Sequence, residues 1–78
     1  MDLKLKDMEI GSTGEVAGYS RSDAVYRDKL LAMGLTKGTP FKVLRVAPLG
    51  DPVEIEVRGF RLSLRKAESD VLEIRRLG

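Results

Sequence analysis

The carboxylates at positions 54 and 56 are the first side chains in this sequence that could do chemistry. Glu54 and Glu56 lie two residues apart on a strand-like run, so both side chains leave the same face of it. Paired carboxylates can serve general acid–base chemistry or bind a hard cation. Acid–base chemistry needs a pocket that shifts their pKa values, and an exposed strand face provides none. We therefore interpret both residues, and also Glu68, Asp70 and Glu73, as solvated surface.

The composition removes the side chains on which most small catalytic and metal centres depend. The 78 residues include no cysteine and no histidine. The chain thus lacks any disulfide or thiolate nucleophile, the commonest transition-metal ligand and the usual general base near neutral pH. We predict no catalytic residue, no metal ligand and no cofactor, and hence a protein that is not an enzyme.

Glycines in the middle of the chain raise the question of phosphate binding. Gly34 and Gly38, followed by Thr39 and Pro40, do not match the GxxxxGK[ST] pattern. Phosphate-binding loops also precede a helix, whose N-terminal amides point at the anion. This segment follows a helix-like run instead, so the sequence argues against a phosphate site.

Basic residues in the second half of the chain suggest a nucleic-acid interface as the alternative function. They are Arg58, Arg61, Arg65, Lys66, Arg75 and Arg76. SH3-like and OB-like barrels bind RNA or DNA through such faces. Stacking would need an exposed aromatic there, and Phe60 falls on the apolar phase of its strand, where we expect it to fill the core. With 14 basic and 12 acidic residues the net charge is only +2, and we expect no nucleic-acid partner.

Alternating apolar residues predict short strands over residues 15–20, 41–47, 53–58, 60–65 and 71–77. Gly18 suggests a β-bulge or a close backbone approach in the first strand, and residues 66–70 indicate a turn or a single turn of 3₁₀ helix. Each strand buries only one face, so the sheet must close over a single core. The predicted fold is mainly β: a small SH3-like antiparallel barrel of about five strands, with a flat α+β sandwich as the alternative.

One α-helix is predicted between the first two strands. Tyr26, Leu30 and Met33 recur at i, i+4 and i+7, which is one apolar face of a helix. Gly34 follows where the end of a helix favours the left-handed conformation. Leu35 then falls where an apolar residue packs back on the last turn.

The start of this helix is open by about two residues. Ser22 is the predicted N-cap, and Ser20 with Asp23 forms a competing capping box. Leu5 and Met8, at helical spacing, predict a short helical turn near the N-terminus.

The chain shows neither an export signal nor a membrane span. Residues 1–11 alternate charged with apolar side chains, unlike the apolar centre of a signal peptide. No run approaches the ~18 apolar residues of a transmembrane helix. We expect a cytoplasmic protein with a single domain over residues 1–78.

Two apolar features are predicted to be contact elements. The helix face around Leu30 has two interpretations: plain core packing, the usual role of such a face, or, because the strands alone supply enough apolar residues to fill a small barrel, a partly covered face that leaves a groove for a partner. Leu49 stands at the tip of a turn bounded by Pro48 and Pro52, where a polar residue would be expected.

Nearly the whole chain resembles one family. The helix-to-strand passage RDKLLAMGLTKG (residues 27–38), the turn APLGDP (47–52) and LRK (64–66) with its acidic turn are similar to motifs of ferrous iron transport protein A, FeoA. The opening L-x-x-M-x-x-G-x-x-G (residues 5–14) resembles the start of that family. The resemblance implies an SH3-like barrel with helical decorations, a fold shared with the C-terminal domain of DtxR-type metal-dependent repressors.

The resemblance also implies a function: a small cytoplasmic, non-enzymatic accessory of the ferrous iron transporter FeoB, a membrane protein with a cytoplasmic G-protein domain. The transition-metal binding associated with the family has no support in the residues here, since histidine and cysteine are absent. We predict FeoB as the partner, peripheral rather than inserted contact with the membrane, and a capacity for self-association. The predicted partner-binding residues are Tyr26, Arg27, Leu30, Met33, Gly34, Leu35, Leu49, Gly50, Asp51 and Pro52.

Overall fold

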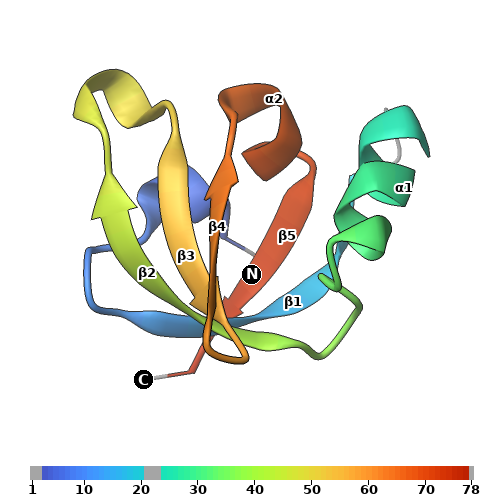
Figure 1. Ribbon diagram of the computed structural model, residues 1–78, viewed down its shortest axis with the longest axis horizontal. Coiled ribbons are helices and arrows are strands. Elements are labelled where there is room, and N and C mark those ends of the chain that lie inside the picture. Colours follow the sequence, from blue (N-terminus) through green and yellow to red (C-terminus); the bar gives the residue numbers. More distant parts are fainter. Residues whose placement is uncertain (1–2, 21–23, 78) are drawn as a thin grey trace.

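A computed structural model describes residues 3–20 and 24–77. The elements along the chain (Figure 1) are η1 (Leu5–Asp7), β1 (Thr13–Tyr19), α1 (Ala24–Ala32), β2 (Pro40–Val46), η2 (Pro48–Gly50), β3 (Val53–Val57), β4 (Phe60–Leu64), α2 (Lys66–Ser69) and β5 (Leu72–Arg76). The predicted strands lie within about two residues of the observed ones. The expected turn at 66–70 contains the short helix α2. The predicted N-cap Ser22, and Asp23 of the competing capping box, lie outside the described residues.

The strands form one antiparallel sheet in the order β4-β3-β2-β1-β5. The sheet is strongly curved, with α2 above it and α1 beside it (Figure 1). Within the described residues no ladder joins β4 to β5, so the barrel is open along that seam. The predicted mainly β, SH3-like architecture with one inserted helix and a short N-terminal helical turn is confirmed.

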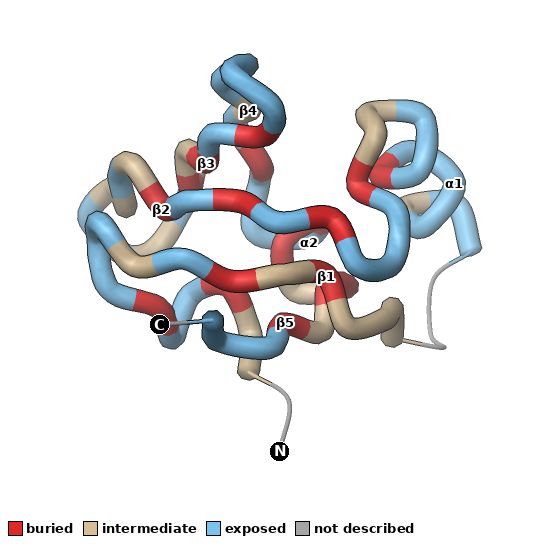
Figure 2. Tube along the Cα trace, turned by 90° about the horizontal axis from the view of Figure 1, so that it is seen from below, coloured by how far each residue is buried: buried red, intermediate tan, exposed pale blue. Residues whose placement is uncertain are grey.

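The core lies inside the curve of the sheet. In β3, Val53, Ile55 and Val57 are buried while Glu56 is exposed, as a strand with one covered face requires. The same alternation holds along the first part of β2, where Phe41 and Val43 are buried (Figure 2). The buried apolar residues are Leu5, Met8, Val16, Leu30, Leu35, Phe41, Val43, Val53, Ile55, Val57, Leu64, Val71, Leu72 and Ile74.

The expectation that Phe60 fills the core is wrong. Its side chain is 73% exposed. Phe60 does keep the phase of the buried Leu64, but it is the first residue after the β3–β4 turn, where the sheet extends beyond the core. The period of a strand gives the face of a side chain and not the depth of cover above it.

The end of α1 forms the predicted Schellman cap. The amide of Gly34 donates to the carbonyl of Leu31 and that of Leu35 to the carbonyl of Leu30, both at 3.0 Å. Gly34 has φ +89°, which glycine adopts without steric cost. Leu30 and Leu35 are both fully buried, so the cap fastens the helix to the core. The Tyr19 hydroxyl also donates a hydrogen bond to the carbonyl of Leu35.

Two glycines give β1 its course along β5. The register between β1 and β5 shifts between Val16 and Gly18, which confirms the predicted bulge. Gly14 is buried and lies so close to β5 that an added Cβ would be 3.0 Å from the carbonyl oxygen of Arg75 and from Cγ2 of Ile74. The first contact is with backbone, which cannot rotate away.

Gly14→Ala should therefore destabilise the fold, by about 1–3 kcal/mol for a forced overpacking. Gly18→Ala is the matched control, because its added Cβ would meet only the end of the Glu73 side chain, at 3.3 Å. Urea titrations of the two variants, followed by circular dichroism, check this expectation. Equal midpoints for the two variants would show that the close approach at Gly14 is unimportant.

No helix among the described residues is both long enough and apolar enough to cross a membrane.

Candidate functional site

The predicted partner-binding residues of α1 separate into buried and accessible ones. Leu30 and Leu35 have no exposed surface, because the inward face of α1 packs into the core. The prediction that their side chains contact a partner is therefore wrong. Tyr26 and Met33 are half-buried against that core. Arg27 is exposed, with its Nε 3.9 Å from a carboxylate oxygen of Asp28. The accessible part of α1 is thus its flank and its C-terminal end.

The loop at residues 47–52 presents Leu49. The Leu49 side chain is fully exposed and its backbone has φ +70°, a left-handed conformation that is unusual for leucine. Two backbone hydrogen bonds hold the loop: Ala47 N–H to the Pro52 carbonyl at 3.1 Å, and Gly50 N–H to the Ala47 carbonyl at 2.8 Å. The Asp51-Pro52 peptide is cis. The loop therefore holds the apolar side chain of Leu49 at its tip, exposed to solvent.

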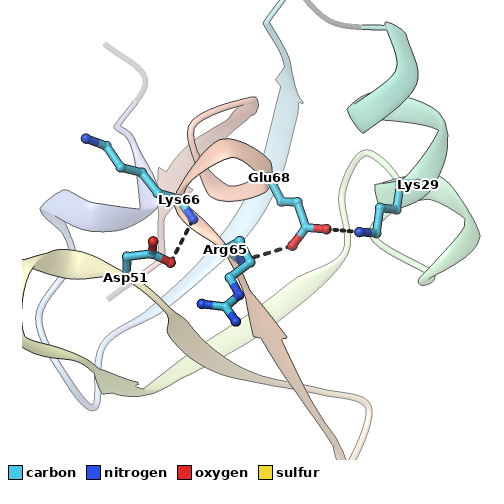
Figure 3. Close-up of polar contacts among 5 residues, drawn as sticks. All are labelled: Lys29, Asp51, Arg65, Lys66 and Glu68. Carbon is cyan, nitrogen blue, oxygen red and sulfur yellow. Dashed lines mark hydrogen bonds and ion pairs between the residues drawn. The ribbon is translucent and has the colours of Figure 1, made fainter.

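Asp51 joins this loop to α2. The Lys66 amide, at the first turn of α2, donates to Oδ1 of Asp51 at 3.1 Å (Figure 3). The Arg65 amide donates to Oε1 of Glu68 at 2.9 Å in the same turn. Both carboxylates satisfy amides that a helix start leaves without intrahelical partners. Asp51, predicted as a partner contact, therefore has a structural bond within the molecule.

Glu68 joins α2 to α1. It is buried, only 4% exposed, so the interpretation of Glu68 as solvated surface is wrong. Its second carboxylate oxygen forms an ion pair with the Lys29 ammonium of α1 (Figure 3). The hydrogen bond from Lys29 holds the pKa of Glu68 below its ordinary value, against the opposing effect of burial, and the Arg65 amide acts in the same direction. The same bond raises the pKa of Lys29.

The loop at residues 47–52, α2 and α1 are thus linked in sequence by side-chain contacts: Asp51 joins the loop to α2, and Glu68 joins α2 to α1. The predicted partner-binding residues come from the two ends of this series: Leu49, Gly50, Asp51 and Pro52 from the loop, and Tyr26, Arg27, Met33 and Gly34 from α1. The two sets do not touch directly in any described contact, and α2 couples them through Asp51 and Glu68 (Figure 3). The sequence indicated a turn at residues 66–70, and the structure forms there the short α-helix α2, with the Glu68 carboxylate accepting from the Arg65 amide.

Lys29→Met should lower the melting temperature by several degrees near neutral pH, more than Lys37→Met, a change at an exposed lysine. The loss arises because the buried Glu68 carboxylate loses its cation. Since the folded-state pKa of Glu68 lies below the ordinary value of 4.5, this stabilisation is complete above that value and vanishes as the pH falls through the folded-state pKa. Melting curves over that pH range test it; a pH-independent difference between the two variants would contradict it.

A groove of about 340 Å³ lies between the end of α1 and the β3–β4 hairpin. Its lining residues are Met33, Val57, Arg58, Phe60, Arg61 and Leu62. The hairpin turn consists of Arg58 and Gly59, with φ +52° and +84°, as a two-residue turn of type I′ requires. Arg58 reaches α1, since its Nη1 would be 3.7 Å from a Cβ added at Gly34. The groove is thus mainly apolar and is also lined by two arginine residues, Arg58 and Arg61.

The strand carboxylates offer no site. Glu54 pairs with Arg45 and Glu56 with Lys42 in the β2–β3 register, so each carboxylate is opposite a basic residue on the neighbouring strand. The interpretation of these two residues as solvated strand surface agrees with that arrangement. In residues 3–20 and 24–77 there is no group of three or more acidic residues placed to hold a metal ion.

These features define the class of the chain: a small SH3-like β module whose distinctive surface elements are an apolar loop tip and a cationic, apolar groove. A family model described as the FeoA domain matches residues 3–76, and the chain belongs to this family, which is linked to ferrous iron transport. The predicted FeoA resemblance is confirmed.

Two relatives place the chain more closely. It is 33% identical over 64 residues to the Fe(2+) transport protein A/Fe(2+) transporter FeoB fusion protein of Porphyromonas gingivalis. The match covers 80% of this chain and 8% of the fusion protein, so the chain spans less than a tenth of that relative. An NMR structure of a FeoA-like protein from Clostridium acetobutylicum superimposes with a TM-score of 0.87 at 34% identity, covering 99% of this chain and 88% of the other.

The fold extends beyond the family. A manganese-dependent transcriptional repressor contains a region that superimposes with a TM-score of 0.89, over 97% of this chain and 37% of the repressor. The identity is only 18%, so the likeness establishes a shared fold and carries no function.

Proposed function

We propose that this chain is a non-enzymatic accessory module that binds the ferrous iron transporter FeoB on its cytoplasmic side and supports ferrous iron uptake. The support from relatives is the fusion protein, in which a segment similar to this chain is joined to FeoB in one polypeptide. Two domains that are fused in one polypeptide have a high effective concentration relative to each other, which favours their binding.

The observation that carries the proposal is Leu49. Its side chain gains no burial in the fold, and its left-handed backbone is a conformation that costs leucine about 1–2 kcal/mol. Neither property stabilises the free module. A contact surface accounts for both, because an ordered apolar tip can enter a pocket on a partner with little further loss of conformational entropy.

The proposed surface contains the loop at residues 49–52 and the accessible end of α1. Leu49 is the apolar anchor, while Arg27, Tyr26 and Met33 supply the second end of the contact. Gly34 keeps the helix end in place, and the Asp51–Lys66 hydrogen bond fixes the loop on α2. Leu30 and Leu35 act behind this surface as core.

Ferrous iron uptake in cells tests the proposal. A strain that lacks this chain should take up labelled ferrous iron more slowly than the parent, and a plasmid copy of the chain should restore the parental rate. The FeoB level in membranes is measured in parallel by immunoblot, so that a loss of transporter is not mistaken for a loss of regulation. Parental uptake in the strain without the chain would contradict the proposal.

Nucleic-acid binding is the second candidate, and the exposed Phe60 favours it. An exposed aromatic in a groove that Arg58 and Arg61 also line can stack on a base. Fluorescence anisotropy with single-stranded RNA at low salt tests this candidate. Neutralising Arg58, Arg61 and Arg65 together should abolish any such binding, which should also weaken steeply with salt.

A further inference from the structure

The strand β4 has an open edge. Within the described part of the chain, β3 is the only strand that pairs with β4. In a two-residue hairpin the residues flanking the turn are the hydrogen-bonded pair, and bonded pairs alternate with non-bonded ones. Val57 with Phe60 and Ile55 with Leu62 are therefore the bonded pairs, so Arg61 and Ser63 carry the amides and carbonyls that face the open edge.

The open edge borders the groove between the hairpin and α1. Phe60 and Leu62, on the core-facing side of β4, form its apolar wall with Val57, and Met33 closes it from α1. The edge is accessible over a short length only, because α2 begins at Lys66 directly after β4. Three or four residues of an added strand would fit alongside it at about 3.3 Å per residue.

The groove carries positive charge. Arg58 and Arg61 both line it. The charged residue opposite Arg61 on β3 is Glu56, and no ion pair between the two is found in the described residues. Arg58 occupies a left-handed turn position, φ +52°, that asparagine or glycine fills with less strain. An arginine there makes the hairpin less stable than it could be and places a cation at the mouth of the groove.

We propose that this groove binds an extended acidic peptide segment of a partner protein, which adds to β4 as a strand and inserts an apolar side chain beside Phe60. Backbone groups of Arg61 and Ser63 would pair with the peptide, as in other cases of strand addition to a sheet edge. Arg58 and Arg61 would select acidic side chains. The inference goes beyond the association with FeoB, since it uses the β3–β4 hairpin, shares only Met33 with the proposed FeoB surface, and does not require FeoB to be the source of the peptide.

Charge decides between this occupant and two others. A second copy of the chain pairing through its own β4 would bring a further arginine and no acidic side chain to the edge, which is unfavourable. Nucleic acid would use Phe60 and the arginines, yet it would leave the amides and carbonyls of the open edge without strand partners. Only an acidic peptide uses the edge, the apolar wall and the cations together.

The test is NMR titration of the ¹⁵N-labelled chain with a capped heptapeptide of alternating aspartate and valine. We expect saturable shifts at the Arg61 and Ser63 amides and around Phe60 and Met33, and a weaker affinity at higher salt. A lysine–valine heptapeptide should not bind. The same acidic peptide with N-methylated alternate amides should lose at least about tenfold in affinity, which side-chain contacts alone would not cause.

Variants complete the test. Arg58→Asn, which suits the left-handed turn, combined with Arg61→Gln should weaken peptide binding at least about tenfold. The matched control Arg75→Gln with Arg76→Gln, away from the groove, should leave it unchanged. The proposal is overturned if the acidic peptide causes no chemical-shift changes, if the changes lie outside β4 and the groove, or if the N-methylated peptide binds with equal affinity. It is also overturned if the groove binds single-stranded RNA in place of the peptide, or if the chain forms a concentration-dependent dimer through β4.

Discussion

Leu30→Ala should lower the free energy of unfolding by about 2–5 kcal/mol, the usual loss for a leucine removed from a packed core. Leu30 is fully buried, and its carbonyl accepts the hydrogen bond that closes the cap of α1. A chain of this size has a total stability of roughly 4–12 kcal/mol. The variant should therefore be partly unfolded at ambient temperature or close to it.

The control for this prediction is Leu49→Ala, the same chemical change on a fully exposed side chain. It should alter stability by less than about 0.5 kcal/mol. Urea denaturation of both variants, followed by far-ultraviolet circular dichroism, gives the comparison. Similar unfolding midpoints for the two variants would mean that the assignment of Leu30 to the core and Leu49 to the surface is wrong.

Leu49→Asp should weaken the binding of this chain to FeoB at least about tenfold, because a charged group would have to enter the pocket that receives the leucine. The effect should appear without a change in stability, since Leu49 makes no core contact. Binding is measured with purified FeoB in detergent, by microscale thermophoresis of the labelled chain.

Ile10→Asp is the matched control, since Ile10 is another exposed apolar residue, 63% accessible, outside the proposed surface. Its affinity for FeoB should equal that of the wild type. If both variants bind equally well, Leu49 is not an anchor. If both lose binding, the contact reflects general surface hydrophobicity and the proposed surface is wrong.

The strands and the end of α1 were predictable because their signals are local. Val53, Ile55 and Val57 alternate with charged residues, and Gly34 with Leu35 carries the whole cap signal within one turn of the chain. The FeoA family was predictable for a related reason: its motifs are short and contiguous, and they cover nearly the whole sequence.

What the sequence did not reveal depends on partners far along the chain. Asp51 looks like a loop carboxylate until the amide of Lys66 is found beside it, fifteen residues later. Glu68 looks solvated until Lys29 of α1 reaches it. Phe60 follows the apolar phase, and only the extent of the core shows that nothing covers it.

The same reasoning explains why the candidate contact residues divided as they did. An apolar helix face gives the direction of Leu30 and Met33 but not how completely the sheet covers each of them. In the structure the sheet covers Leu30 fully and Met33 only in part. The groove beside Met33 is bounded on its other side by the β3–β4 hairpin, where Phe60 is exposed.

The measurement that tests the account most directly is the binding of this chain to full-length FeoB and to its isolated G domain, each immobilised and compared with an unrelated membrane protein. The account predicts saturable binding to full-length FeoB that Leu49→Asp weakens and Ile10→Asp does not, and binding to the G domain shows whether that domain holds the contact. Absence of saturable binding to full-length FeoB, with a folded chain and an active transporter, would contradict it.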